Sequence, residues 1–151
     1  MRSIIIFVTI FTMTTVQAQR FGAMADSSRK GMVREKLMQM QENYIRENLV
    51  LSDAQAQVFW PVYREHLRAA GALKMEKTKI MGEIKRNYEL MTDAELDKMI
   101  QSTFEIERKI IDENQSFTSK VKSAIPPKKI VRLKLLELEY KKMLLKKAQN
   151  K

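Results

Sequence analysis

Hydrophobic residues recur at helical spacing along most of the chain. They stand three or four positions apart from Arg29 to Asn48, and again over residues 53–90 and 93–124, which places them along one side of a helix. A fourth stretch starts at Pro127, a residue suited to the first turn of a helix. The pattern predicts an all-α chain of four helices. The predicted core positions are, helix by helix, Val33, Leu37, Met40, Tyr44 and Ile45; Phe59, Tyr63, Leu67, Ala70, Leu73, Ile80, Met81, Ile84 and Tyr88; Leu96, Ile100, Thr103, Ile110, Asn114, Phe117, Val121 and Ala124; and Ile130, Leu133, Leu136, Tyr140, Met143 and Leu144.

Two of these helices are preceded by a capping box. Ser52 is followed three residues later by Gln55, and Thr92 is followed three residues later by Glu95. In this arrangement the hydroxyl accepts a hydrogen bond from the backbone of the third residue, whose side chain reaches back to the first. We therefore expect the second and third helices to begin at these boxes.

Two charged residues interrupt the apolar stripes. Lys77 lies between Leu73 and Ile80 in the apolar stripe of the second helix, and Glu107 lies within the apolar stripe of the third helix. The third stripe otherwise has the seven-residue spacing of a coiled coil. Because the connections are tight, sequential helices should pack antiparallel.

The predicted helices are long for a chain of this size. The second, with about 38 residues, would span roughly 57 Å, whereas a compact globule of this length would be roughly 36 Å across. Either the second helix is broken around Pro61 and Gly71, or the molecule is elongated. We expect the second case, an elongated four-helix hairpin or cradle. Because one layer of helices cannot cover all of its own apolar stripes, we also expect a dimer.

The N-terminus has the pattern of a secretory signal. Arg2 is a short basic region, residues 4–13 are mostly apolar, and Val16-Gln17-Ala18 is a small-residue cleavage pattern. The apolar run is shorter than the roughly 18 residues that a membrane-spanning helix needs. We predict a signal peptide over residues 1–18, a flexible segment over 19–28 and a single helical domain over 29–151, exported and without stable membrane insertion.

The amino-acid composition excludes most kinds of catalytic site. The chain has no cysteine and one histidine, His66, so it lacks thiol nucleophiles, cysteine metal ligands and histidine clusters. We predict no enzyme activity, no cofactor and no metal site. His66 lies at the edge of the second stripe, where a packing role is expected.

Positive charge is concentrated at the C-terminal end. The chain has 28 Lys and Arg against 18 Asp and Glu, and residues 126–151 hold nine basic residues against Glu137 and Glu139. One interpretation is a solvated helix with a favourable basic C-terminus. The other is an electrostatic patch that attracts negatively charged partners.

Export out of the cytoplasm reduces the classes of negatively charged partner that a basic chain can meet. No helix-turn-helix or RNP-like pattern is present, and an exported chain is sent away from nucleic acid. The remaining candidate partners are anionic membrane surfaces, contacted peripherally, and acidic or unfolded polypeptides. Nine methionines follow residue 18, and they suit either core filling or a surface that adapts to many partners.

A short motif at the start of the second helix resembles a known family. Leu51-Ser52-Asp53-Ala54-Gln55 is similar to the L-T-x-x-Q box of the Spy/CpxP family of exported helical proteins, with Ser in the Thr position. The continuation Phe59-Trp60-Pro61-Val62-Tyr63 resembles the branch found in Bacteroidetes. The family's second box would fall at residues 125–129, where Pro and Lys depart from it. The motif residues are Leu51, Ser52, Gln55, Phe59, Trp60, Pro61 and Tyr63.

The resemblance implies a thin, dimeric helical cradle in the periplasm. Its members act as ATP-independent chaperones for unfolded clients, or as periplasmic inputs to envelope-stress and metal-resistance signalling. The metal-sensing members use several histidines, which His66 alone does not provide.

We therefore predict an exported chaperone-like protein that binds unfolded or partly folded clients through a basic, partly apolar helical surface. The alternative is a periplasmic sensor or adaptor for one dedicated envelope protein. The candidate client-binding residues are Met75, Met99, Lys128, Lys129, Arg132 and Lys134.

Overall fold

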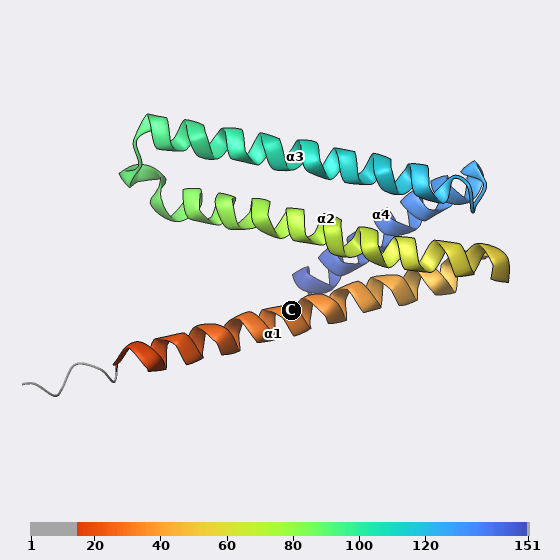
Figure 1. The fold of residues 1–151 in the computed structure, drawn as a ribbon, viewed down its shortest axis with the longest axis horizontal. Helices are drawn as coiled ribbons and strands as arrows, with labels where there is room; N and C mark the ends of the chain where they lie inside the picture. Colours follow the sequence, from red (N-terminus) through yellow and green to blue (C-terminus); the bar gives the residue numbers. More distant parts are fainter. Residues whose placement is uncertain (1–14, 151) are drawn as a thin grey trace, which may run out of the picture. The chain divides into compact units, whose positions relative to one another are not determined.

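The computed structural model describes residues 15–150, with side chains at Arg29 and from Gly31 onwards. Its elements are α1 (Thr15–Asn48), α2 (Asp53–Asn87), the single 3-10 turn η1 (Tyr88–Leu90), α3 (Asp93–Val121) and α4 (Pro127–Gln149) (Figure 1). Residues 15–150 contain no strand. The all-α class is therefore confirmed.

The first helix starts earlier than predicted. α1 begins at Thr15, so residues 19–28 are helical, although the sequence predicted a flexible segment there and a helix only from Arg29. The segment lacks apolar periodicity, which indicates that it has no packing face. Periodicity is not needed for helix formation, however, and Ala, Met, Arg and Gln in this segment are good helix formers. Residues 1–14, which hold most of the predicted signal peptide, lie outside the described residues.

The chain divides into two units, Met1–Leu37 and Met38–Lys151. In the first unit, Val33 and Leu37 are largely exposed, although the sequence predicted them at core positions. In the second unit, the end of α1 and the following Leu49 contact α2 and α4, with Gln41 the first of these residues. The core contribution of α1 therefore comes from its last two turns.

Both predicted capping boxes are present. The Gln55 backbone N–H donates to Ser52 Oγ at 3.4 Å, and the Ser52 N–H donates to Gln55 Oε1 at 3.2 Å. Thr92 and Glu95 make the same reciprocal pair at the start of α3. Pro127 occupies the first turn of α4. α2 continues through Pro61 to Asn87.

Polar side-chain contacts link α2 and α3, which are antiparallel neighbours. His66 Nδ1 lies 2.9 Å from Glu113 Oε1, and Lys77 donates to Glu107. The two charged residues that interrupt the predicted stripes are thus partners of each other. Figure 1 shows the two helices side by side, with η1 joining them at one end.

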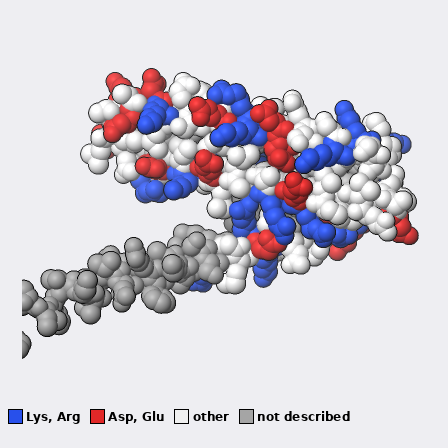
Figure 2. Space-filling model, viewed as in Figure 1, with Lys and Arg blue, Asp and Glu red and all other residues white. Residues whose placement is uncertain are grey.

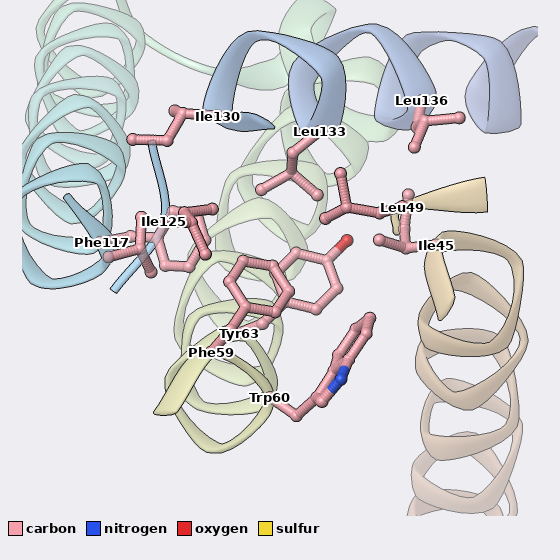
Figure 3. Packing of buried hydrophobic residues seen from close by; sticks show 11 residues of the cluster. Ile45, Leu49, Phe59, Trp60, Tyr63, Phe117, Ile125, Ile130, Leu133 and Leu136 are labelled. Carbon is pink, nitrogen blue, oxygen red and sulfur yellow. The ribbon is translucent and has the colours of Figure 1, made fainter. Parts of the chain in front are cut away.

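The hydrophobic core lies at the other end of this pair. Phe59 and Tyr63 of α2 stack with ring centroids 5.3 Å apart, and Phe117 of α3 lies 5.9 Å from Tyr63. α4 presents buried residues to these rings (Figure 3), as its predicted stripe requires. The buried cluster comprises Ile45, Leu49, Phe59, Trp60, Tyr63, Phe117, Val121, Ile125, Ile130, Leu133 and Leu136.

The end of α1 is fixed to this core by polar contacts. The Arg46 guanidinium lies 3.9 Å from the ring centre of Trp60, and Arg46 also donates to Glu42 at 2.6 Å. Gln41 Nε2 donates to the Tyr63 hydroxyl at 3.2 Å. Burial of Trp60, which lies outside the predicted stripe, therefore depends on a residue from another helix.

The capping box should contribute to stability rather than to binding. Ser52→Ala should lower the free energy of unfolding by about 1 kcal/mol, because the Gln55 N–H loses its acceptor at the helix start. Ser52→Gly should cost only a few tenths of a kcal/mol. Urea unfolding of the three proteins measures both differences. A Ser52→Ala protein of unchanged stability that no longer binds clients would instead assign the motif to a binding site.

Candidate functional site

The motif residues lie in the core and at its edge. Phe59, Trp60 and Tyr63 are buried, Leu51 is half-buried against the same cluster, and Pro61 is exposed. Desolvation in this cluster raises the pKa of the Tyr63 phenol far above its ordinary value, so its hydroxyl stays neutral. The aromatic part of the motif therefore serves packing.

The beginning of α4 meets the motif directly. Lys129 Nζ donates to Gln55 Oε1 at 2.7 Å, and Gln55 Oε1 also accepts from the Ser52 backbone. The structure thus brings together two residues that the sequence selected for different reasons. Their contact joins the start of α2 to the start of α4.

His66 is a buried packing residue, as expected. Its ring stacks on Phe117 at 4.2 Å, and Glu113 Oε1 lies 2.9 Å from its Nδ1. Lys134 of α4 lies 5.5 Å from the centre of the Phe117 ring. Burial lowers the pKa of His66, whereas the hydrogen bond with Glu113 acts in the opposite direction. Glu113 could not be recognised from the sequence pattern, because its partner is 47 positions away.

The α2–α3 pair is closed at its core end and open towards η1. Tyr63 and Met81 are 18 residues apart, which is about five turns, so they lie on the same side of α2. Tyr63 is 0 % exposed beneath α1 and α4, whereas Met81 is 48 % exposed. The same helix side is therefore a core surface at one end and a solvent-facing apolar surface at the other.

α3 adds three apolar side chains to this open side. Ile100, Phe104 and Ile111 share one side of α3 at steps of four and seven residues, and they are 42, 47 and 55 % exposed.

An ion pair between Lys120 and Glu65, 3.4 Å long, defines the opposite side. Ile111 lies nine residues from Lys120, about two and a half turns around α3. Met81 lies sixteen residues from Glu65, which again is close to the opposite side of its helix. We call the set Met81, Ile100, Phe104 and Ile111 the open face.

The opposite side of the pair is polar. Lys and Arg side chains alternate with Asp and Glu over the α2–α3 surface seen in Figure 2. Mixed charges of this kind are typical of a solvated surface. The apolar open face is therefore a local feature of one side of the pair.

The two methionines selected from the sequence lie in different places. Met75 is exposed, and helical spacing places it away from the side that carries Tyr63 and Met81. Met99 is half-buried on α3, on the side of Phe117, from which it is 18 residues away. Neither belongs to the open face, and their roles in binding stay predictions.

Three of the four basic residues selected in α4 have hydrogen-bond partners. Lys129 donates to Gln55, Arg132 to Glu139 at 3.2 Å and Lys134 to Glu137 at 3.3 Å. Lys128 is exposed. The charges of Arg132 and Lys134 are therefore partly offset by carboxylates of α4, whereas Lys129 bonds to a neutral amide.

The described residues offer little other chemistry. In residues 15–150, no group of three or more His, Asp or Glu side chains is placed to hold a metal ion. An open hollow of about 450 Å³ lies on α3 beside Ile111. Its polar lining residues Asn114 and Thr118 donate to carbonyls of their own helix.

Comparison of the chain with protein-family models, curated proteins and solved structures finds no match. Within the described part of the chain, no helix is long and apolar enough to cross a membrane.

Stability should decrease in mild acid because of His66. Its lowered pKa means that the folded state favours the neutral ring, so the unfolded state binds more protons once the pH falls below about 6.5. The stabilisation is complete above that pH and is lost as the pH falls through the lower folded pKa. Urea unfolding between about pH 7.5 and 5.5 measures this decrease.

The control is His66→Gln, which keeps a polar side chain beside Glu113. This variant should be less stable at neutral pH and should show a smaller decrease towards acid. A decrease of equal size in both proteins would assign it to the carboxylates instead.

Proposed function

We propose that the protein is an exported, ATP-independent chaperone that holds unfolded or partly folded clients on its open face. One observation carries the proposal: the side of α2 that buries Tyr63 continues to Met81 without cover. An exposed apolar surface on a folded chain is a common feature of interaction sites. The Leu51-Ser52-Asp53-Ala54-Gln55 motif and its resemblance to the Spy/CpxP family support the same function.

The open face suits loose binding of many sequences. Its four side chains are aliphatic, thioether and aromatic, and such contacts are non-directional. Flexible apolar side chains such as methionine can adapt to different partners. A client would be held by apolar burial without nucleotide, and released by its own folding.

The proposal includes the periplasm as location and a homodimer with an elongated cradle shape. The signal pattern at residues 1–18 supports export. Residual apolar surface on α2 and α3 supports a second copy that covers part of it. Light scattering of the exported protein should give twice the mass of one chain.

The test is suppression of aggregation of several unrelated unfolded clients in the absence of nucleotide. The wild-type protein should suppress each of them near equimolar ratio. The double variant Met81→Asn with Phe104→Asn should hold clients roughly tenfold more weakly, because two partly exposed apolar side chains are lost. High salt should leave complexes intact once they have formed, because apolar contacts are not screened.

The matched control is Val58→Asn. Val58 is also a half-exposed apolar residue of α2, but it does not belong to the open face. Val58→Asn should suppress aggregation like the wild type, and Met75→Asn measures the role predicted for Met75. If every client aggregates unchanged, the chaperone proposal fails. Activity towards one envelope protein alone would favour the sensor or adaptor.

A further inference from the structure

A second apolar stripe runs along the outer side of α4. Val131, Leu135, Leu138 and Leu145 follow one another at steps of four, three and seven residues and are 60, 48, 56 and 55 % exposed. These steps place them on one side of the helix. The buried positions of α4 lie on its other side, towards the core (Figure 3). α4 is therefore apolar on two sides, and only one of them is covered by the second unit.

Lysines accompany this stripe along its whole length. Lys142 stands within it, four residues after Leu138 and three before Leu145. Lys128 and Lys146 border one edge and Lys141 the other, as their spacing from the stripe requires. All four lysines are exposed. We call these lysines together with Val131, Leu135, Leu138 and Leu145 the outer face of α4.

The acidic residues of α4 are already engaged. Glu137 pairs with Lys134 at 3.3 Å, and Glu139 pairs with Arg132 at 3.2 Å. Glu139 also accepts a hydrogen bond from the Tyr44 hydroxyl at 3.4 Å. The four lysines of the outer face therefore keep their positive charge for a partner.

The positive charge of the outer face of α4 favours an anionic surface over a second copy of the chain as its partner. A second copy docked through the same face would bring Lys142 close to like charges in an otherwise apolar contact, which is unfavourable. An anionic surface avoids this conflict. Lysine side chains can bury their aliphatic stems beside the apolar stripe while their ammonium groups reach negatively charged groups.

We propose that the outer face of α4 binds the surface of an anionic lipid bilayer. The helix would lie in the plane of the bilayer, with Leu135, Leu138 and Leu145 at the boundary of the acyl chains and the lysines at headgroup phosphates. The combined apolar and electrostatic contributions make the contact peripheral and reversible. This inference does not depend on client holding, because the outer face shares no residue with the open face.

A site-specific label tests the proposed orientation. The chain contains no cysteine, so Leu138→Cys and Met75→Cys each carry one bimane label on the exported full protein. Both positions are exposed in the structure. With vesicles of phosphatidylcholine and phosphatidylglycerol, the label at position 138 should shift to shorter wavelength and the label at position 75 should not. Vesicles of phosphatidylcholine alone should shift neither.

Charge and apolar variants test the two contributions separately by vesicle co-sedimentation. Lys142→Gln with Lys146→Gln should lower the affinity for anionic vesicles about thirtyfold at low salt, or about fivefold for each lysine. Leu135→Asn with Leu138→Asn should also lower it, and the residual binding should disappear at high salt. Thermal unfolding should change little in the lysine variant and only by the lower helix propensity of Asn in the leucine variant, because these side chains lie outside the core.

Three results would overturn the proposal. Equal binding to neutral and anionic vesicles would indicate a contact that does not use the lysines. Binding that leaves the label at Leu138→Cys unshifted would place the contact elsewhere in the chain. Absence of vesicle binding would leave an acidic protein surface as the alternative occupant. Met81→Asn with Phe104→Asn should retain vesicle binding, so failure of the chaperone proposal and failure of this one are distinguishable.

Discussion

Burial of the aromatic cluster around Tyr63 is the interaction on which the second unit depends. Phe59 and Tyr63 of α2 pack against Phe117 of α3, and α1 and α4 contribute Ile45, Leu133 and other aliphatic residues to the same cluster. All four helices therefore meet at one end of the α2–α3 pair. No second cluster of this kind is present along the rest of the pair in the described residues, where Ala70 and Ile106 are buried and Lys77 pairs with Glu107. The uneven distribution of the core leaves the open face uncovered.

Local signals predicted the helices well. The capping boxes at Ser52 and Thr92 act within four residues, and both are present as expected. The stripe of α4 was also predicted correctly, because Ile130, Leu133 and Leu136 are buried at the expected spacing. Such features depend on neighbours in sequence, so one chain is enough to recognise them.

Features that depend on distant residues could not be predicted. The sequence placed Tyr63 and Met81 in one stripe, but only the positions of α1 and α4 determine that one is buried and the other exposed. Glu113 is recognised as the partner of His66 only when α2 and α3 are aligned. The outer stripe of α4, from Val131 to Leu145, also has a regular helical spacing in the sequence. It was overlooked because the buried stripe with Ile130, Leu133 and Leu136 was sufficient to predict the helix. The sequence therefore predicted that apolar and basic residues lie on helix surfaces, but not where on the helices these surfaces lie, and their roles in binding stay predictions.

Hydrogen exchange in the presence of a client tests the central claim most directly. Part of the α2–α3 pair is held by few buried apolar contacts, so its amides should open locally and exchange faster than those around Tyr63. A permanently unfolded, reduced and alkylated protein serves as the client. Binding should slow exchange in peptides that contain Met81 and Phe104, and should leave peptides around Tyr63 and Phe117 unchanged. Protection confined to α4, or no protection in any peptide, would contradict the account.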